Sequence, residues 1–134
     1  MGVLQQILDH YGGRVRFVWR DLPIITPQSP KAAEAGQCAN VQGKFWEYHD
    51  LLYARAPALS ISDLKSYAAE MELDTTAFNK CLDSGQFQAK VAQNQQDAYN
   101  HGAHATPSFL VNNQLVVGPQ PFSTFQSFID PLLK

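Results

Sequence analysis

A proline immediately before an apolar stretch near the C-terminal end of the chain constrains the fold more than any other feature. The stretch reads His104-Ala105-Thr106-Pro107-Ser108-Phe109-Leu110-Val111-Asn112-Asn113. Proline donates no backbone hydrogen bond, so within sheets it usually marks a strand start or an edge. An X-Pro bond is also where a cis peptide costs least. The sequence therefore predicts a strand over 108–111, entered through Thr106 and Pro107 and ended by an Asn-Asn turn.

Hydrophobic periodicity predicts a helix-rich chain with three short strands. The strand expected first, over 14–20, alternates basic and apolar residues and places Val15, Phe17 and Trp19 on one face. Capping residues at Ser29, Ser60 and Asp74 mark helix starts. The expected helices cover residues 3–11, 31–40, 45–53, 64–71, 75–82, 86–101 and 122–132, and the other two strands cover 108–111 and 115–117.

Length and composition favour one compact domain over residues 1–134. The 134 residues are 45% hydrophobic and 16% charged, with a formal net charge of -2, and a chain of this length buries most of its apolar surface in one core. The charge excludes the basic footprint of a nucleic-acid binder. No apolar run is long enough to span a membrane, and the N-terminus lacks signal-peptide features.

The order of elements predicts an α/β layer fold with a helical block inserted between strands over about 30–101. Four segments in this order resemble the DsbA-like thiol:disulfide oxidoreductases, and the similarity covers essentially the whole chain. The segments are Arg14 to Pro23, Gln42 to Leu52, Ala105 to Phe109, and Gly118 to Phe122. The resemblance implies a thioredoxin-like fold.

The chain departs from that family at its beginning. A complete member begins with a strand that ends at Cys-x-x-Cys, whereas this sequence has no Cys-x-x-Cys and starts within the following helix. We therefore expect an N-terminally truncated fold without its first central strand. Its two neighbours would lack partners, and three arrangements stay open: direct pairing, a strand from a second copy, or a strand from another polypeptide. We favour association between copies.

The two cysteines, Cys38 and Cys81, fit neither a zinc site nor a short redox motif. Three interpretations stay open: buried thiols, a structural disulfide that joins two inserted helices, or a redox-active pair. Neither cysteine stands at a helix N-terminus, where a thiolate would be stabilised. A structural disulfide is favoured.

The resemblance implies a role for Thr106 and Pro107. In the family this loop contains a cis proline, and the residue before it pairs with extended substrate backbone. Transferred to this chain, Thr106 and Pro107 become the expected binding site for an extended peptide or protein substrate.

Other polar and aromatic residues give weaker signals. The histidines at positions 10, 49, 101 and 104 lack ligand spacing, so no metal and no cofactor are expected. Glu47, Asp50 and Asp63 are interpreted as helix charges or caps. Phe45, Trp46, Tyr48 and Tyr53 follow helical spacing and are interpreted as core.

Three functional hypotheses follow, with a kappa-class glutathione transferase type as a weaker one. The favoured one is a domain of the disulfide oxidoreductase family that is redox-inactive as this chain and retains the peptide-binding loop. The second is a fragment of an active enzyme whose catalytic segment lies upstream. The third is a non-enzymatic binding or assembly module. The resemblance also suggests a bacterial extracytoplasmic protein.

Overall fold

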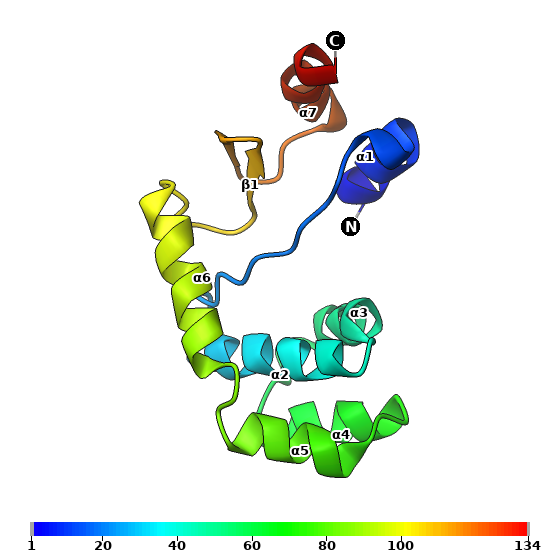
Figure 1. Cartoon of the computed structure of the whole chain (residues 1–134), viewed down its shortest axis with the longest axis vertical. Helices are drawn as coiled ribbons and strands as arrows, with labels where there is room; N and C mark the ends of the chain where they lie inside the picture. The colour runs from blue at the N-terminus through cyan, green and yellow to red at the C-terminus, as the bar shows by residue number, and fades with distance from the viewer. Residues whose placement is uncertain (1, 134) are drawn as a thin grey trace. The chain divides into compact units, whose positions relative to one another are not determined.

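The computed structural model describes residues 2–133 (Figure 1), so residues 1 and 134 of the predicted domain lie outside the described residues. Contacts divide the chain into two compact units, residues 1–20 with 98–134 and residues 21–97. The described residues are mostly helical and contain a two-stranded sheet. The helical block expected over about 30–101 overlaps most of the second unit.

The first unit contains the sheet. Strands β1 (Ser108–Val111) and β2 (Gln114–Val117) form an antiparallel hairpin in which Ser108 faces Val117 and Val111 faces Gln114. The two-residue turn between them places Asn112 at a φ of 52°, a left-handed conformation that asparagine tolerates. The remaining elements of the unit are α1 (Gly2–Tyr11), a 3-10 turn (Gly12–Arg14), α7 (Phe122–Ile129) and a second 3-10 turn (Asp130–Leu133).

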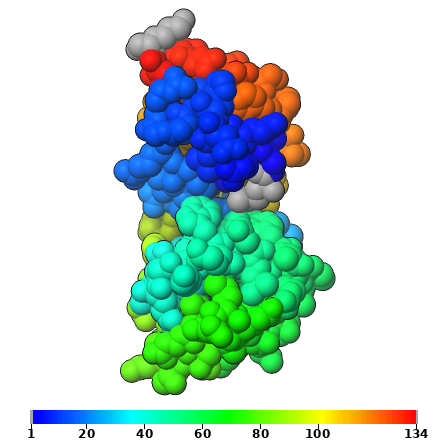
Figure 2. All heavy atoms as spheres, turned by 90° about the vertical axis from the view of Figure 1, so that its right-hand side faces the viewer, coloured from blue at the N-terminus to red at the C-terminus, as the bar shows by residue number. Residues whose placement is uncertain are grey.

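One face of the hairpin packs in the core of the first unit. The rings of Phe109 and Phe125 meet edge to face at 4.8 Å between centroids. Helix α1 lies beside α7 in two views (Figures 1 and 2), and Tyr11 donates a 2.6 Å hydrogen bond to Asp130. The buried members of this core are Ile7, Tyr11, Val116, Phe125 and Ile129.

The strand predicted over 14–20 is wrong. Val15 has extended backbone angles, but residues 16–20 form an irregular connection. Among the described residues, the sheet contains β1 and β2 alone, so this segment is not one of its strands. Alternation predicts which side of a strand is apolar, but a strand also requires a hydrogen-bonded neighbour. Direct pairing of this segment with β1, one of the three arrangements left open, is therefore not observed.

The second unit is a cluster of helices. It contains α2 (Ser29–Val41), α3 (Phe45–Arg55), α4 (Ile61–Glu70), α5 (Thr75–Asp83) and most of α6 (Gln88–Asn100). The predicted caps of α4 and α5 are confirmed. Ser60 and Asp63 form a reciprocal capping box, and the Asp74 side chain accepts from the backbone of Ala77. Ser29 is not the cap of α2, since the helix begins at this residue and its hydroxyl accepts from Thr26 N–H.

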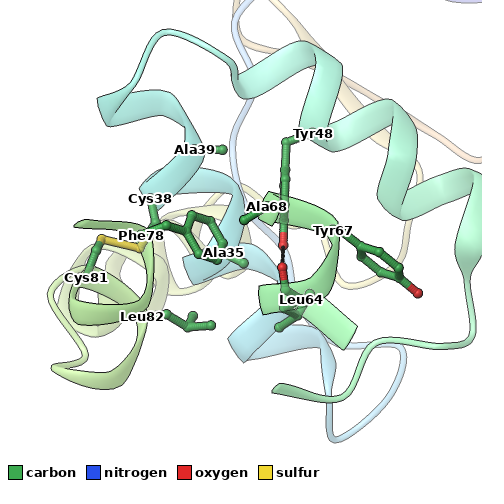
Figure 3. Packing of buried hydrophobic residues seen from close by; sticks show 10 residues of the cluster. All are labelled: Ala35, Cys38, Ala39, Tyr48, Leu64, Tyr67, Ala68, Phe78, Cys81 and Leu82. Atoms are coloured by element: carbon green, nitrogen blue, oxygen red, sulfur yellow. Dashed lines mark hydrogen bonds between the residues drawn. A yellow bond between two sulfur atoms is a disulfide. The ribbon is translucent and has the colours of Figure 1, made fainter. Parts of the chain in front are cut away.

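The core of the second unit surrounds two fully buried aromatic rings (Figure 3). Tyr48 and Phe78 lie 5.5 Å apart between ring centroids, and the Tyr48 hydroxyl donates to the Leu64 carbonyl at 2.9 Å. This bond satisfies a polar group that burial would otherwise penalise. The expectation that the aromatic residues of α3 are core is wrong for Trp46 and Tyr53, which are 42% and 65% exposed.

Candidate functional site

The loop at Thr106 and Pro107 is exposed and its peptide bond is cis. Two hydrogen bonds fix its shape: the Ser108 hydroxyl donates to the Ala105 carbonyl, and Gly118 N–H donates to the Pro107 carbonyl at 2.8 Å. The second bond ties the loop to the residue that follows β2. The loop is therefore an ordered entrance to the hairpin.

The register of the hairpin determines which backbone groups face outward from β1. In an antiparallel pair, hydrogen-bonded and non-hydrogen-bonded positions alternate. The bond from Gly118 to Pro107 makes these two residues a bonded pair, so Phe109 and Val111 direct their N–H and C=O groups toward β2. Ser108 and Leu110 direct theirs toward the other edge of β1, where the sheet of the described residues has no further strand.

Thr106 continues this outer edge beyond the strand. Within residues 2–133, no hydrogen bond to its backbone N–H or C=O is found. Ser108 and Leu110 are spaced by two residues, the period at which backbone groups of a strand face the same edge, and Thr106 precedes them in the bend of residues 105–107. The site is therefore a short row of backbone donors and acceptors that begins at the cis-proline loop.

The end of α6 supports the loop from the N-terminal side. Gly102 ends the helix with a φ of 84°, a conformation that favours glycine. Ala103 is buried and its N–H donates to the Ala98 carbonyl at 2.9 Å. The imidazole of His104 stacks on the ring of Tyr99, with 5.1 Å between centroids and 22° between planes.

Both cysteines lie in the second unit, in a disulfide between α2 and α5 (Figure 3). Their Cα atoms are 5.9 Å apart, and Cys38 and Cys81 are 1% and 8% exposed. Of the three interpretations that the sequence left open, buried free thiols is wrong. Both cysteine sulfurs of this sequence are thus bonded and shielded from solvent.

The structure assigns the four histidines to different surroundings. His10 packs against Tyr11 and Phe122, while His49 is buried in the second unit with its Nδ1 3.1 Å from the Asp50 carboxylate. Across residues 2–133 there is no group of three His, Cys, Asp or Glu side chains arranged to hold a metal ion.

The sequence alone does not predict a buried hydrogen-bond network in the second unit. Gln37 is buried on α2, donates to the Asp21 carboxylate at 2.9 Å and accepts from Lys90 Nζ at 3.0 Å. The signal in the sequence was one glutamine on an otherwise Ala-rich helix, which does not reveal distant partners. These two hydrogen bonds connect the start of the unit to α2 and α6. The bond from Gln37 also satisfies the buried carboxylate of Asp21, which is costly to bury without a partner.

Perturbed acidities occur on α1 and α3, outside the loop. Burial, with the hydrogen bond to Asp130 as the next cause, raises the pKa of Tyr11 to about 12. Burial also raises the pKa of Tyr48, and partial desolvation of its ring raises the pKa of Tyr53. Tyr11 and Tyr48 remain neutral at physiological pH and act through packing and hydrogen bonds.

Solved structures of oxidoreductases are similar to this chain. A thioredoxin-like oxidoreductase from Silicibacter pomeroyi is 30% identical, with a TM-score of 0.86, and the match covers 98% of this chain and 76% of that protein. The thiol-disulfide exchange protein alpha-DsbA2 from Wolbachia pipientis is 18% identical, with a TM-score of 0.82, over 98% of this chain and 72% of that one. These matches confirm the α/β thioredoxin-like fold with a helical insertion.

Curated relatives include much longer transport proteins. The Na(+)/H(+) antiporter NhaA 3 of Salinispora tropica is 39% identical over 107 residues, which is 78% of this chain and 16% of the antiporter. NhaA of Herminiimonas arsenicoxydans is 36% identical over 129 residues, 96% of this chain and 21% of that protein. This chain therefore spans about a fifth or less of these relatives. None of the helices within residues 2–133 has the length and apolar character needed to cross a membrane.

The profile of the thioredoxin family matches residues 2–131, nearly the entire chain. It agrees with the resemblance carried by the sequence motifs and with the similarity to the solved oxidoreductases. This chain belongs to the thioredoxin family.

Proposed function

We propose that this chain is the polypeptide-binding part of a DsbA-like disulfide oxidoreductase system and holds an extended segment at the Thr106–Pro107 loop. The observation that carries the proposal is the row of outward backbone groups at Thr106, Ser108 and Leu110. An extended polypeptide binds such an edge by adding a strand, and main-chain hydrogen bonds supply affinity with little dependence on sequence.

The surroundings of the row favour this role. The loop that begins it is exposed and is held in shape by bonds to Ala105 and Gly118. Leu110 on the edge is 45% exposed, so an incoming strand would gain apolar contact as well as hydrogen bonds. A pre-shaped edge loses little conformational entropy on binding.

The sulfur chemistry supports binding rather than exchange by this sequence. Thiol–disulfide exchange requires an accessible thiolate or an accessible disulfide. Cys38 and Cys81 are bonded and buried, and no other cysteine is present. We infer that the chain as given is redox-inactive toward protein substrates, with the disulfide in a structural role.

Two variants at one position test the binding edge. Leu110→Pro removes an outward N–H and leaves the bonded pairs to β2 intact, because proline is tolerated where a strand edge faces solvent. Leu110→Ala removes the same side chain and keeps the N–H. We expect labelled extended peptides to lose most of their binding to the proline variant and a much smaller part of it to the alanine variant, as measured by fluorescence anisotropy.

Backbone-methylated peptides complete the test without changing the protein. A peptide N-methylated at alternate positions that would face β1 should bind weakly, and the same peptide methylated at the intervening positions should bind normally. Equal binding of both peptides would show that backbone pairing is not the mode of recognition. Pro107→Ala, which alters the loop, should also weaken binding.

Active catalysis is the alternative that the relatives favour, because the Silicibacter pomeroyi protein is described as an oxidoreductase and extends beyond the part matched by this chain. In this alternative, residues N-terminal to those given supply the Cys-x-x-Cys. Reduction of insulin by an N-terminally extended chain, and not by residues 1–134, would favour it.

A second copy of this chain competes for the same edge. Two β1 strands could pair edge to edge, because unpaired strand edges promote association. Native mass spectrometry at micromolar concentration distinguishes the occupants. If added peptide dissociates a dimer, the peptide and the second copy both bind the edge of β1. If saturating peptide leaves the dimer intact, the two copies contact each other elsewhere.

A further inference from the structure

The part of the first unit that bears the loop has an unusual charge pattern. Residues 98–129, which include the end of α6, the loop, the hairpin and α7, contain no Asp, Glu, Lys or Arg. Their titratable side chains are those of Tyr99, His101 and His104. A protonated imidazole carries a positive charge, so the two histidines are the side chains of this segment that can attract a carboxylate.

His104 is the histidine nearer to the binding row in sequence. It is exposed and precedes Thr106 by two residues, so their Cα atoms are within about 7 Å of each other. Residues 105–107 form a bend before β1, so His104 lies beside the end of a strand added along β1, and a long side chain opposite Thr106 can span the short distance to it. Stacking on Tyr99 limits the orientations of the imidazole.

The other charged groups of the first unit have different neighbours. Asp9 accepts from Gln5, His10 packs on Phe122, Arg14 lies over the Tyr11 ring, and Asp130 accepts from Tyr11. Arg16 and Arg20 are exposed on the irregular segment before the second unit. Among the described residues, the ring found against His104 is that of Tyr99.

We propose that His104 is a specificity-determining residue that favours a polypeptide with a carboxylate side chain opposite the Thr106–Pro107 loop. The proposal rests on the proposed polypeptide-binding function. The protonated imidazole donates a charge-assisted hydrogen bond to the carboxylate, and the neutral imidazole attracts it much less. Preference for acidic polypeptides therefore increases as the pH falls below neutral.

A matched pair of peptides tests the proposal on the full chain. One extended peptide carries a single Glu at its central position, and its partner carries Gln there. We expect the Glu peptide to bind about two- to fivefold more tightly than the Gln peptide at about pH 5.5, the range of an exposed ion pair. At about pH 8 the difference between the two affinities should be smaller, because an imidazole that has lost its proton carries no charge.

Variants assign the effect to one histidine. His104→Gln should make the affinities of the Glu and Gln peptides equal at the lower pH while both peptides still bind, which a general loss of structure would not do. His101→Gln removes the neighbouring imidazole and should preserve the preference. A preference lost in His101→Gln and kept in His104→Gln overturns the assignment.

The outcomes separate this proposal from the function on which it rests. If both peptides bind with the same affinity at both pH values, the carboxylate preference is wrong and polypeptide binding stands. If neither peptide binds at either pH, both proposals fail. A preference for Glu that persists unchanged at the higher pH also contradicts the role of His104.

Discussion

The two units of this chain differ in their buried cores and in whether a strand edge is left open. The unit of residues 21–97 surrounds large buried side chains with helices, contains a disulfide and pairs the buried polar groups of Asp21, Gln37 and Tyr48 internally. The unit of residues 1–20 with 98–134 has a smaller buried core and leaves the outer edge of β1 without a further strand among the described residues. One unit is closed by its own side chains, and the other presents backbone groups outward.

The difference indicates where recognition and stability reside. Open backbone edges bind other chains readily, whereas buried apolar packing and cross-links mainly stabilise a fold. Changes in the helical unit should therefore alter unfolding with little direct effect on the edge of β1. The following three predictions test this division, from the largest expected effect to the smallest.

Phe78→Ala should be the most damaging single change. The Phe78 side chain is fully buried between helices and lies against Tyr48. Truncating a buried phenylalanine to alanine typically costs about 3–5 kcal/mol, through lost burial and the cavity left behind. Urea denaturation followed by far-UV circular dichroism should show the transition of the helical unit at a much lower urea concentration.

Val41→Ala is the control for this prediction. Val41 lies on α2 in the same unit but is exposed, so its truncation should change the free energy of unfolding by less than about 0.5 kcal/mol. Amide exchange of β1 and β2 under native conditions should be similar in both variants. If Phe78→Ala accelerated exchange in the hairpin as much as in the helices, the two units would behave as one and the comparison would fail.

Removing the disulfide should have the second largest effect. The bond links residues separated by 43 positions, and a loop of this size contributes about 4 kcal/mol in the chain-entropy estimate, with measured effects often nearer 2 kcal/mol. The double variant Cys38→Ala, Cys81→Ala should unfold at a lower temperature than the oxidised chain in calorimetry. Peptide binding at 25 °C should be retained.

Reductant supplies the matching control. Dithiothreitol should lower the unfolding temperature of the native sequence and leave that of the double variant unchanged. An oxidised chain with the same unfolding temperature as the double variant would remove the structural role of the bond. Loss of peptide binding by a still folded double variant would instead connect the disulfide to recognition.

Local signals made much of the helical unit predictable from the sequence. The capping box of Ser60 and Asp63 and the cap at Asp74 depend on residues within one turn, so their patterns identify helix starts directly. The stop of α1 at Gly12 is likewise local, since the structure places this residue at a φ of 57°. Apolar periodicity also located the buried faces, although it could not show that Trp46 and Tyr53 are largely exposed.

The prediction that failed, and the features that the sequence did not predict, depend on partners that are distant in the sequence. Residues 14–20 have the alternation of a strand, yet strand formation depends on a neighbour that the segment itself does not encode. The chain from Asp21 through Gln37 to Lys90 joins three separate segments, and no local pattern reveals it. At the candidate site the sequence indicated Thr106 and Pro107, but the outward backbone groups of Ser108 and Leu110 required the hairpin register.

Tyr11→Phe should have the smallest effect, and its pH dependence identifies the cause. The variant removes the hydrogen bond from the buried Tyr11 hydroxyl to Asp130, which should cost about 1 kcal/mol. Because the folded state raises the pKa of Tyr11 from 10.0 to about 12, it binds the phenolic proton more tightly than the unfolded state does. This contribution to stability is fully present below pH 10 and is lost as the pH rises toward 12.

The measurement is urea denaturation across this pH range, with both proteins carrying Trp46→Phe so that tryptophan fluorescence reports on Trp19, which lies in the same unit as Tyr11. The difference in stability between the native sequence and Tyr11→Phe should shrink as the pH rises from 10 to 12. A difference that stays constant would assign the effect to packing. Tyr11→Phe should loosen α1 and the C-terminal turn, while β1 keeps its register. Peptide binding at neutral pH should therefore be the same in both proteins. This result would show that the hydrogen bond stabilises the small core without affecting the edge that recognises the polypeptide.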